Sequence, residues 1–375
     1  MSDWLFIFGR TPQLSLNELI AVSPLPVSVI AEGVARISDQ DGRISPESMI
    51  RTLGGTVKIA RVLGTCDTPG PEALTEFLAA GDRESVTFGV SGYGETDGAL
   101  GHILPQIKHA LAVKGIRSRY VSASEGGQVS SVVITKQHVE ELIVVRVGNE
   151  YLVGKTAAVQ DFEAWNQRDY GRPFADPRSG MLPPKVARMA VNIATVKEKR
   201  QTEKGNVLLD PFCGMGTILA EAVLTGWEVF GSDQSPEVVE KAKKNLAWLG
   251  RKGTMFACDA THISEHVPAE SVDSIVTEPY LGPASVTAER AKDIIKGLEK
   301  LYIGCLREWY GVLKPEGIIV IAMPQYAVSG RTYFVKNVID RCETLGYTVM
   351  EGPLTYSREH AIVSRKFYVL KRIRQ

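Results

Sequence analysis

The chain has 375 residues, a length at which two or three domains are expected. Its 43 basic and 43 acidic side chains cancel, so a nucleic-acid surface would have to come from local patches and not from bulk basicity. The five cysteines lie far apart with no C-x-x-C pair, and no stretch is long and apolar enough to span a bilayer. We therefore expect a cytoplasmic protein with no disulfide framework, no metal site and no membrane partner.

The first predicted module, residues 1–75, alternates strands and helices in the order βαββαβ. Strands are expected at 3–9, 27–30, 34–37 and 58–64, and helices at 14–22 and from residue 46 onwards. This order is typical of a ferredoxin-like module. Small and turn-forming residues at 65–71 mark its end.

The second predicted module, residues 76–158, contains a helix at 103–114 and strands at 85–91, 118–121, 131–134, 141–146 and 150–156. Four basic residues occur between residues 102 and 124 with no acidic residue among them: Lys108, Lys114, Arg117 and Arg119. Such a run is typical either of phosphate contacts or of an ordinary solvated face, and the sequence leaves both interpretations open.

Residues 159–180 are predicted to be a polar and aromatic linker, and a different pattern begins at residue 181. A helix is expected to start at 183–185, and strands then alternate with helices. The strands are expected at 206–210, 228–233, 255–259, 274–277 and 317–323, with a long helix at 288–313. This alternation predicts an α/β domain with a doubly wound parallel sheet. Two closing strands, 347–354 and 361–370, predict an antiparallel hairpin at the sheet edge, which is common in methyltransferases and unusual in nicotinamide-binding domains.

The stretch 208–217 is an apolar strand that ends on Asp210, followed by a turn with two glycines, Gly214 and Gly216, and by a helix. Glycines in such a turn let a nucleotide-like ligand approach backbone N–H groups without meeting a Cβ atom. The spacing resembles the dinucleotide fingerprint, but Leu219 stands where its third glycine is expected. The turn is more similar to the Asp-Pro-Phe-x-Gly-x-Gly-Thr form of S-adenosylmethionine-dependent methyltransferases. An ordinary tight turn is the alternative interpretation.

Acidic residues follow four predicted strands in succession: Asp210, Asp233, Asp259 and Glu278. Because the carboxyl ends of such strands meet at one edge of the sheet, we expect a binding crevice there. For S-adenosylmethionine, Asp233 would accept both ribose hydroxyls, Asp259 the adenine amino group, and Asp210 would pair with the methionine amine. The predicted cofactor-binding residues are Asp210, Pro211, Cys213, Gly214, Gly216, Thr217, Asp233, Gln234, Asp259 and Ala260.

Several stretches resemble tRNA guanine N2-methyltransferases that carry a THUMP domain, of the archaeal and eukaryotic guanosine-10 type. They are residues 5–10, 14–19, 178–185 and 210–217. The resemblance implies a THUMP-like RNA-binding domain at 76–158, a Rossmann-like class I methyltransferase domain at 181–375, and tRNA as the partner. Lys185 and Arg188, in the helix expected from residue 183, are added to the basic run as expected RNA contacts. A monomer is expected, with an accessory subunit as an open alternative.

The catalytic motif of such enzymes, Asp/Asn-Pro-Pro-Tyr/Phe, corresponds to Glu278-Pro279-Tyr280. The resemblance implies that Glu278 and the Pro279 carbonyl accept hydrogen bonds from the guanine amine, while the Tyr280 ring holds the base. Glutamate replaces the usual aspartate, and one proline is missing. Either Tyr280 takes the second proline position and Leu281 the aromatic one, or the loop is one residue shorter and Tyr280 is the stacking ring. Three functions therefore stay open: a tRNA guanine N2-methyltransferase, an amino-methyltransferase acting on rRNA guanine or on adenine N6 of DNA or RNA, and an RNA-binding protein without catalysis.

Overall fold

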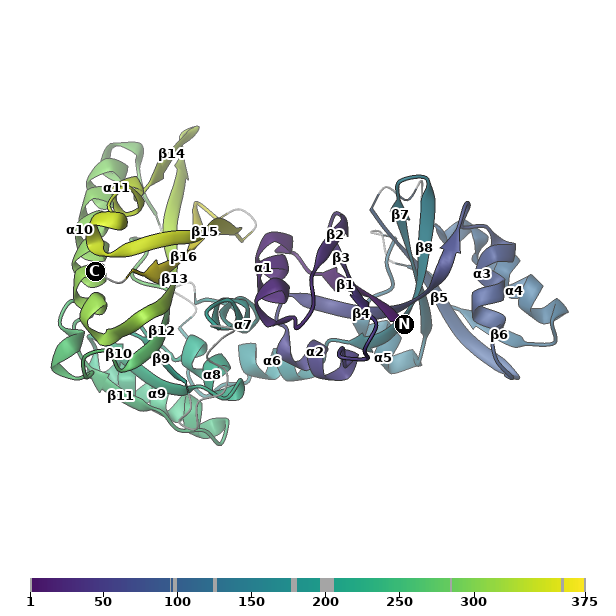
Figure 1. Cartoon of the computed structure of the whole chain (residues 1–375), viewed down its shortest axis with the longest axis horizontal. Helices are drawn as coiled ribbons and strands as arrows, with labels where there is room; N and C mark the ends of the chain where they lie inside the picture. The colour runs from purple at the N-terminus through teal and green to yellow at the C-terminus, as the bar shows by residue number, and fades with distance from the viewer. Residues whose placement is uncertain are drawn as a thin grey trace. The chain divides into compact units, whose positions relative to one another are not determined.

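The computed structural model describes residues 2–94, 96, 100–123, 127–176, 181–195, 206–283, 285–358 and 361–373. The chain divides into two compact units, Met1–Ala164 (unit 1) and Trp165–Gln375 (unit 2) (Figure 1). Among the described residues, no helix has both the length and the apolar character that crossing a bilayer requires.

The described residues of unit 1 form an eight-stranded sheet in the order β2-β3-β1-β4-β8-β7-β5-β6. Its strands are β1 (Ser2–Phe8), β2 (Ser28–Ala31), β3 (Val34–Asp39), β4 (Thr56–Cys66), β5 (Ser85–Tyr93), β6 (Arg117–Tyr120), β7 (Glu140–Val147) and β8 (Glu150–Val159). Its helices are α1 (Pro12–Val22), α2 (Pro46–Thr52), α3 (Pro71–Ala79), α4 (Leu104–Val113) and α5 (Ser131–Gln137), with a 3-10 turn η1 (Leu100–Ile103). The first six elements follow the βαββαβ order expected from the sequence.

The two predicted N-terminal modules share this sheet, because β4 of the first pairs antiparallel with β8 of the second. The predicted boundary at residue 75 falls inside α3. A buried ion pair lies at the junction, where Lys58 Nζ is 2.5 Å from Glu141 Oε1 and donates to the Val129 carbonyl at 2.7 Å. Burial lowers the pKa of Lys58, and the Glu141 carboxylate opposes that shift.

The expectation of a strand at residues 131–134 is wrong, because these residues begin helix α5. The Ser130 side chain accepts the backbone N–H of Val133 at 3.3 Å and so caps the helix. This capping bond satisfies one of the free N–H groups at the helix start, which outweighs the β-branched character of the run.

Unit 2 holds a second sheet in the order β11-β10-β9-β12-β13-β16-β15, with β14 paired to β13. Its strands are β9 (Val207–Asp210), β10 (Glu228–Asp233), β11 (Thr254–Ala257), β12 (Val272–Thr277), β13 (Leu313–Val328), β14 (Arg331–Phe334), β15 (Tyr347–Tyr356) and β16 (Val363–Arg372). The helices are α6 (Phe162–Tyr170), which starts in unit 1, α7 (Pro184–Ile193), α8 (Thr217–Leu224), α9 (Pro236–Trp248), α10 (Ala288–Val312) and α11 (Lys336–Asp340), with turns η3 (Ile263–Glu265) and η4 (Glu343–Leu345).

This second sheet has the doubly wound form predicted from the alternating pattern. Strands β9 to β13 pair in parallel, and the closing hairpin β15–β16 is antiparallel. Helix α8 contacts α7 and α9, whereas α10 contacts α11, so the helices form two groups. The short elements β14 and α11 were not expected from the sequence.

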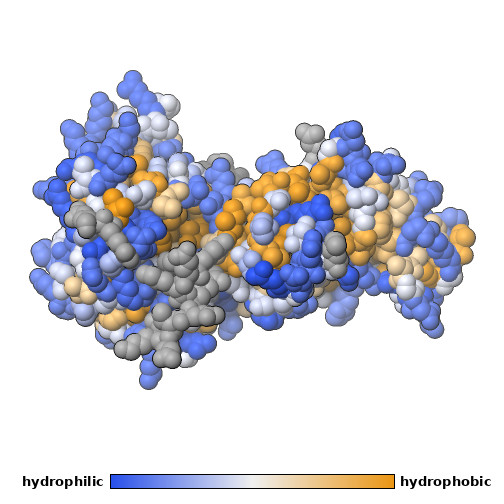
Figure 2. All heavy atoms as spheres, in the orientation of Figure 1, coloured by the Kyte–Doolittle hydropathy of each residue, from blue (hydrophilic) through white to orange (hydrophobic). Residues whose placement is uncertain are grey.

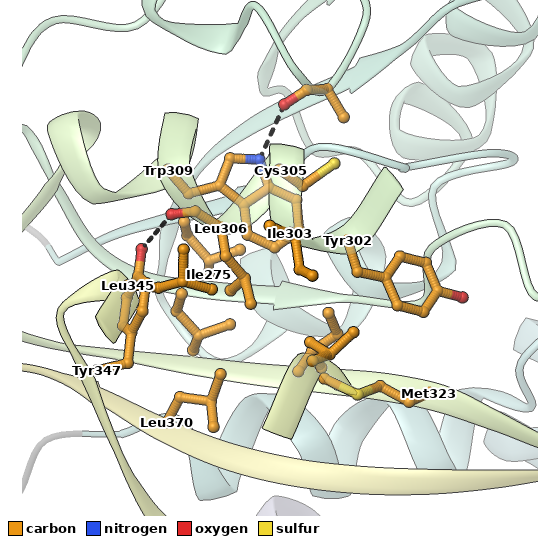
Figure 3. Packing of buried hydrophobic residues seen from close by; sticks show 14 of the residues in the cluster. Ile275, Tyr302, Ile303, Cys305, Leu306, Trp309, Met323, Leu345, Tyr347 and Leu370 are labelled. Carbon is orange, nitrogen blue, oxygen red and sulfur yellow. Dashed lines mark hydrogen bonds between the residues drawn. The ribbon is translucent and has the colours of Figure 1, made fainter. Parts of the chain in front are cut away.

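The main core of unit 2 lies between α10 and the sheet (Figure 3). Ile319, Ile321 and Met323 alternate along β13 and contribute to the same fully buried cluster, as the period of a strand requires. The buried Trp309 ring belongs to this cluster and donates its N–H to the Ala260 carbonyl at 3.0 Å. The core therefore fixes the backbone at one of the predicted cofactor residues.

Candidate active site

Acidic residues stand at or just beyond the carboxyl ends of four adjacent strands, β11, β10, β9 and β12. Asp233 is the last residue of β10, Asp210 is the last of β9, and Glu278 directly follows β12. Asp259 was expected at the end of its strand, but β11 ends two residues earlier, at Ala257. We name the carboxyl groups of Asp210, Asp233 and Glu278 the acidic edge.

Asp210 is the buried member of the acidic edge, with 1% of its surface exposed. Its Oδ1 accepts the Thr277 hydroxyl at 2.7 Å and the Phe212 N–H at 3.2 Å. Burial raises the pKa of Asp210 to about 7; the two hydrogen bonds oppose this rise, and the charges of Asp233 and Glu278 add to it. The charges of Asp233 and Glu278 therefore both act on Asp210, as expected for one site.

The two glycines of the turn have different roles, although both adopt positive φ angles of 49° and 80°. A Cβ atom at Gly216, where α8 begins, would lie 3.3 Å from side-chain atoms of Ala242 and Leu246. A Cβ atom at Gly214 would meet no atom within 4 Å. Gly216 is therefore required for close packing against α9, whereas Gly214 faces open space that a ligand can approach.

Cys213 lies in the same turn, and its backbone N–H donates to the Ser232 carbonyl at 2.8 Å. Its side chain is buried, and burial raises the pKa of the thiol far above its usual value, with the charges of Asp210 and Asp233 adding to the effect. A thiol in that state is a poor nucleophile, so Cys213 is a packing residue of the turn.

Asp233 and Asp259 differ in how strongly the fold holds them. Asp233 is half-buried, and its Oδ1 accepts the Ser235 N–H at 3.0 Å. Asp259 is exposed, and its Oδ1 accepts both the N–H of Thr261 at 2.9 Å and its hydroxyl at 2.8 Å; these bonds lower the pKa of the Asp259 carboxyl. Gln234, between these two in the chain, is exposed.

Glu278 forms an ion pair with Arg365 of β16, a residue that sequence reasoning missed. The two side chains are 17% and 8% exposed. Burial raises the pKa of Glu278, while Arg365, Arg358 and the backbone N–H of Leu182 oppose the rise. Arg358 also donates to the Met181 carbonyl at 2.5 Å, so arginines of the closing hairpin contact both the predicted catalytic motif and the segment that precedes α7.

The loop after Glu278 is held from the core by two fully buried tyrosines. The Tyr302 hydroxyl donates to the Tyr280 carbonyl at 2.7 Å, and the Tyr326 hydroxyl donates to the Leu281 carbonyl. Gly282 follows with a φ of 90°, and a Cβ atom there would lie 2.1 Å from the Tyr326 oxygen. Pro279 is buried, while Tyr280 keeps 59% of its surface exposed. The backbone of the loop is therefore fixed, and its aromatic ring is accessible.

Other predicted cofactor residues are engaged within the fold. The Pro211 carbonyl accepts the Ser232 hydroxyl at 3.2 Å, and the Thr217 hydroxyl accepts from Arg172 at 2.7 Å. Gly216 and Thr217 also line a small cavity of about 20 Å³, together with residues of α6 and α9. None of the acidic-edge residues lines this cavity, so it is separate from the acidic edge. No group of three or more His, Cys, Asp or Glu among the described residues is arranged to hold a metal.

The predicted basic run lies in unit 1, with Lys108 on α4, Lys114 directly after it, and Arg117 and Arg119 on β6. All four side chains are exposed. Acidic residues from outside the run partly neutralise it, since Lys114 lies 2.9 Å from Glu76 and Arg117 lies 3.7 Å from Glu84. Exposed pairs of this kind contribute little energy, so the side chains can still turn towards phosphate.

Arg188, predicted as an RNA contact, requires correction. It is 4% exposed and lies 2.7 Å from Glu221, which is itself buried, so it is a structural residue inside unit 2. Lys185 is half-buried with its ammonium 5.8 Å from the centre of the Trp165 ring, and burial lowers its pKa. The first three residues of the predicted motif 178–185 lie outside the described residues.

Comparison with known proteins finds a family match over the part of the chain that contains the acidic edge. Residues 172–333 match the family model described as "RMKL-like, methyltransferase domain". The tRNA (guanine(10)-N2)-dimethyltransferase of Pyrococcus abyssi is 35% identical over 201 residues, which cover 53% of this chain and 52% of that protein. The protein of the same name from Methanothermobacter thermautotrophicus is 36% identical over 183 residues, covering 48% and 50%. The chain thus spans about half the length of these curated relatives.

A solved structure shares the fold over nearly the whole chain. The crystal structure of TrmN from Thermus thermophilus covers 99% of this chain and 100% of that chain, with a TM-score of 0.58 and 18% sequence identity. These comparisons confirm the predicted fold class, a class I methyltransferase domain preceded by α+β structure, and the predicted family resemblance. S-Adenosylmethionine is the cofactor of this class of domain.

Proposed function

We propose that this chain is an S-adenosylmethionine-dependent RNA methyltransferase that methylates the exocyclic N2 amine of a guanosine in tRNA. The observation that carries the proposal is the acidic edge beside the open Gly214 turn, with Pro279 and Tyr280 directly after it. The methyltransferase-domain match covers these same residues. The names of the two archaeal relatives support guanosine 10 of tRNA as the substrate.

The residues present fit S-adenosylmethionine. The space at Gly214 admits a ligand to the backbone of the turn, and the half-buried Asp233 carboxylate accepts the ribose hydroxyls. Asp259 and Ala260, on the loop anchored by Trp309, hold the adenine. Asp210 pairs with the methionine amine. Three carboxyl groups near a cationic ligand are electrostatically favourable.

In this proposal the catalytic work of the chain is to position the guanine amine. Glu278 and the Pro279 carbonyl accept hydrogen bonds from the two amine protons, which directs the nitrogen lone pair away from the ring system. The accessible Tyr280 ring stacks on the base. When bound, S-adenosylmethionine would supply the methyl group as the electrophile and keep the C–S electron pair, and the amine would lose one proton in exchange. Alignment of two reactants can supply about 7–11 kcal/mol.

The N-terminal residues supply RNA binding in this proposal. Residues 1–75 form a ferredoxin-like module, supported by the sheet order β2-β3-β1-β4, and residues 76–158 form a THUMP-like domain. Residues 159–180 connect them to the methyltransferase domain at 181–375 and contain α6. The proposal also includes a cytoplasmic monomer, with an accessory subunit as the alternative.

One assay tests the function directly. Labelled S-adenosylmethionine is incubated with unmodified tRNA transcripts, and the methylated nucleoside is identified by mass. We expect N2-methylguanosine or its dimethyl form, and no product from transcripts in which guanosine 10 is replaced by adenosine. Methylated guanosine in rRNA only, or methylated adenine, would favour the other amino-methyltransferases. Binding of tRNA without any transfer would favour the RNA-binding alternative.

A second assay tests whether the basic run contacts tRNA. Alanine at Lys108, Lys114, Arg117 and Arg119 together should make binding less salt-dependent, because four phosphate contacts release their counterions on binding. The slope of log affinity against log salt should flatten by roughly 3 units, measured by filter binding. A parental slope in the quadruple variant would identify the run as a solvated face. Alanine at Lys241 and Lys243, which pair with acids on α9, is the matched control.

A further inference from the structure

Arg365 lies far from Glu278 in the sequence, and the sheet brings them together. In β16, Arg365 pairs with Pro324 of β13, and β13 pairs in parallel with β12 at Ile321 and Thr277. β16 is therefore two strands away from β12 in the sheet, and the Arg365 side chain extends across β13 to Glu278, the residue that follows β12. Its side chain is 8% exposed, and burying a charge to this extent is costly unless it is paired.

The guanidinium of Arg365 is held as well as buried. Its Nε donates to Glu278 Oε1, and its centre lies 5.7 Å from the centre of the Tyr356 ring. Arg358 and the N–H of Leu182 also stabilise the Glu278 carboxylate. Two further titratable groups face it, Asp210 from β9 and Tyr302 from α10.

These neighbours compete over the charge of Glu278. Burial favours the neutral acid, whereas the two arginines and the N–H of Leu182 favour the carboxylate. The difference is functional, because a carboxylate only accepts hydrogen bonds, while a neutral acid uses one oxygen to carry a proton. An amine donor is therefore held more strongly by the carboxylate than by the neutral acid.

We propose that Arg365 is a positioning residue for methyl transfer, which keeps Glu278 ionised and in the orientation that accepts hydrogen bonds from the substrate amine. This inference rests on the proposed function. Arg365 does not touch the base in this arrangement, and it acts only through Glu278.

The first test measures Glu278 itself and needs no substrate. In protein labelled with ¹³C at the glutamate carboxyl carbons, the Glu278 signal is assigned by its loss in Glu278→Gln and is titrated by NMR. Loss of a neighbouring opposite charge should raise its midpoint by roughly 1–3 pH units in Arg365→Gln. Arg365→Lys should restore most of that shift, because it keeps the charge.

Arg372→Gln is the matched control. Arg372 lies on the same strand, is 10% exposed and pairs with Glu270 at 2.9 Å, but it stands at the other end of β16 from Glu278. It should lower stability without moving the Glu278 midpoint. An unmoved midpoint in Arg365→Gln, or an equal shift in Arg372→Gln, would overturn the inference.

The second test is the pH profile of single-turnover methylation at saturating tRNA and cofactor. In Arg365→Gln the acid limb should move upward with the Glu278 midpoint, so on that limb the rate falls by up to about tenfold for each pH unit of the shift and recovers at higher pH. A loss of equal size at every pH would show a structural effect and overturn the positioning role. If the parent protein transfers no methyl group, the proposed function and the catalytic part of this inference fail together, while the titration still decides whether Arg365 sets the charge of Glu278.

Discussion

Glu221 and Glu278 are two glutamates of unit 2 whose pKa values shift in the same direction but whose surroundings differ. Burial raises the pKa of both carboxyls, and arginines oppose the rise in both cases. Glu221 on α8 is 1% exposed and lies 2.8 Å from Arg168 and 2.7 Å from Arg188. Both arginines also pack on the Trp165 ring, at 4.0 Å and 5.6 Å.

Glu278 keeps 17% of its surface exposed and stands at a strand end beside the other acidic-edge carboxyls. A raised pKa and an arginine partner therefore do not separate the proposed catalytic carboxylate, Glu278, from the structural one, Glu221. Partial exposure next to further charged groups separates the two. Glu221 belongs to a closed cluster that fastens α6 and α7 to α8, and Glu278 belongs to an open one.

The comparison fails if Glu221 is not needed for the stability of the fold. Glu221→Ala leaves the buried Arg188 and the half-buried Arg168 without their carboxylate, so the free energy of unfolding should fall by about 3–5 kcal/mol in urea denaturation. The single-turnover rate of the variant that is still folded should stay near the parental rate. A loss of stability below about 1 kcal/mol would show that the closed cluster is not structural.

Glu278 should show the opposite pattern. Glu278→Ala removes one preorganised acceptor, so single-turnover methylation should slow by about 10²–10³-fold, with cofactor affinity nearly unchanged. Glu278→Gln keeps one acceptor oxygen and should be less impaired. Circular dichroism confirms folding at the assay temperature, since the variants leave Arg365 without its partner. A parental rate in Glu278→Ala would remove Glu278 from the reaction.

Asp233 sharpens the comparison within the acidic edge. Asp233→Ala should weaken S-adenosylmethionine binding by about 1.5–3 kcal/mol, or roughly 10- to 100-fold, because the ribose hydroxyls lose a charged acceptor. Asp233 is half-buried at a strand end, so the fold should survive. Calorimetry on the folded variant gives the answer, and Gln234→Ala is the control. Unchanged affinity would place Asp233 outside the site.

Asp210 predicts a smaller effect that depends on pH. Because its pKa is raised to about 7, the apo carboxyl is mostly neutral at pH 6 and mostly ionised at pH 7.5. A cationic ligand prefers the ionised form, so cofactor affinity should rise roughly eightfold over this range and stay flat in Asp210→Asn. A raised pKa has the reverse effect on the apo fold: its contribution to stability is complete at acid pH and is lost as pH rises towards 7. A parental pH dependence in Asp210→Asn would exclude this role.

The sequence predicts the framework of the site because each part of it is local. Asp210 and Asp233 end strands that the sequence shows as apolar runs. The turn after Asp210 is recognisable from its two glycines. The order of parallel strands then brings the acids together. The expectation for 131–134 failed because β-branched residues were given more weight than the capping serine before them.

Arg365 could not be found by the same reasoning, since it lies 87 residues from Glu278 and comes from the antiparallel hairpin. A signal was present, however. Arg365, Phe367 and Val369 are spaced two residues apart on β16, so they lie on one face, and all three are buried. A charged residue on a buried face requires a partner. The error over Arg188 has the same origin, because its buried partner Glu221 lies on another helix.

The loop after β12 owes its shape to Tyr302 and Tyr326, whose hydroxyls lie 22 and 45 residues along the chain from the carbonyls that they hold. Residues 277–282 grafted alone into another methyltransferase scaffold would therefore keep the sequence of the motif but lose its conformation. A working graft needs three segments: the loop, the part of α10 with Tyr302, and the part of β13 with Tyr326. Within the grafted loop, Gly282 must remain glycine, because the Tyr326 oxygen occupies the space that a Cβ atom at this position would need.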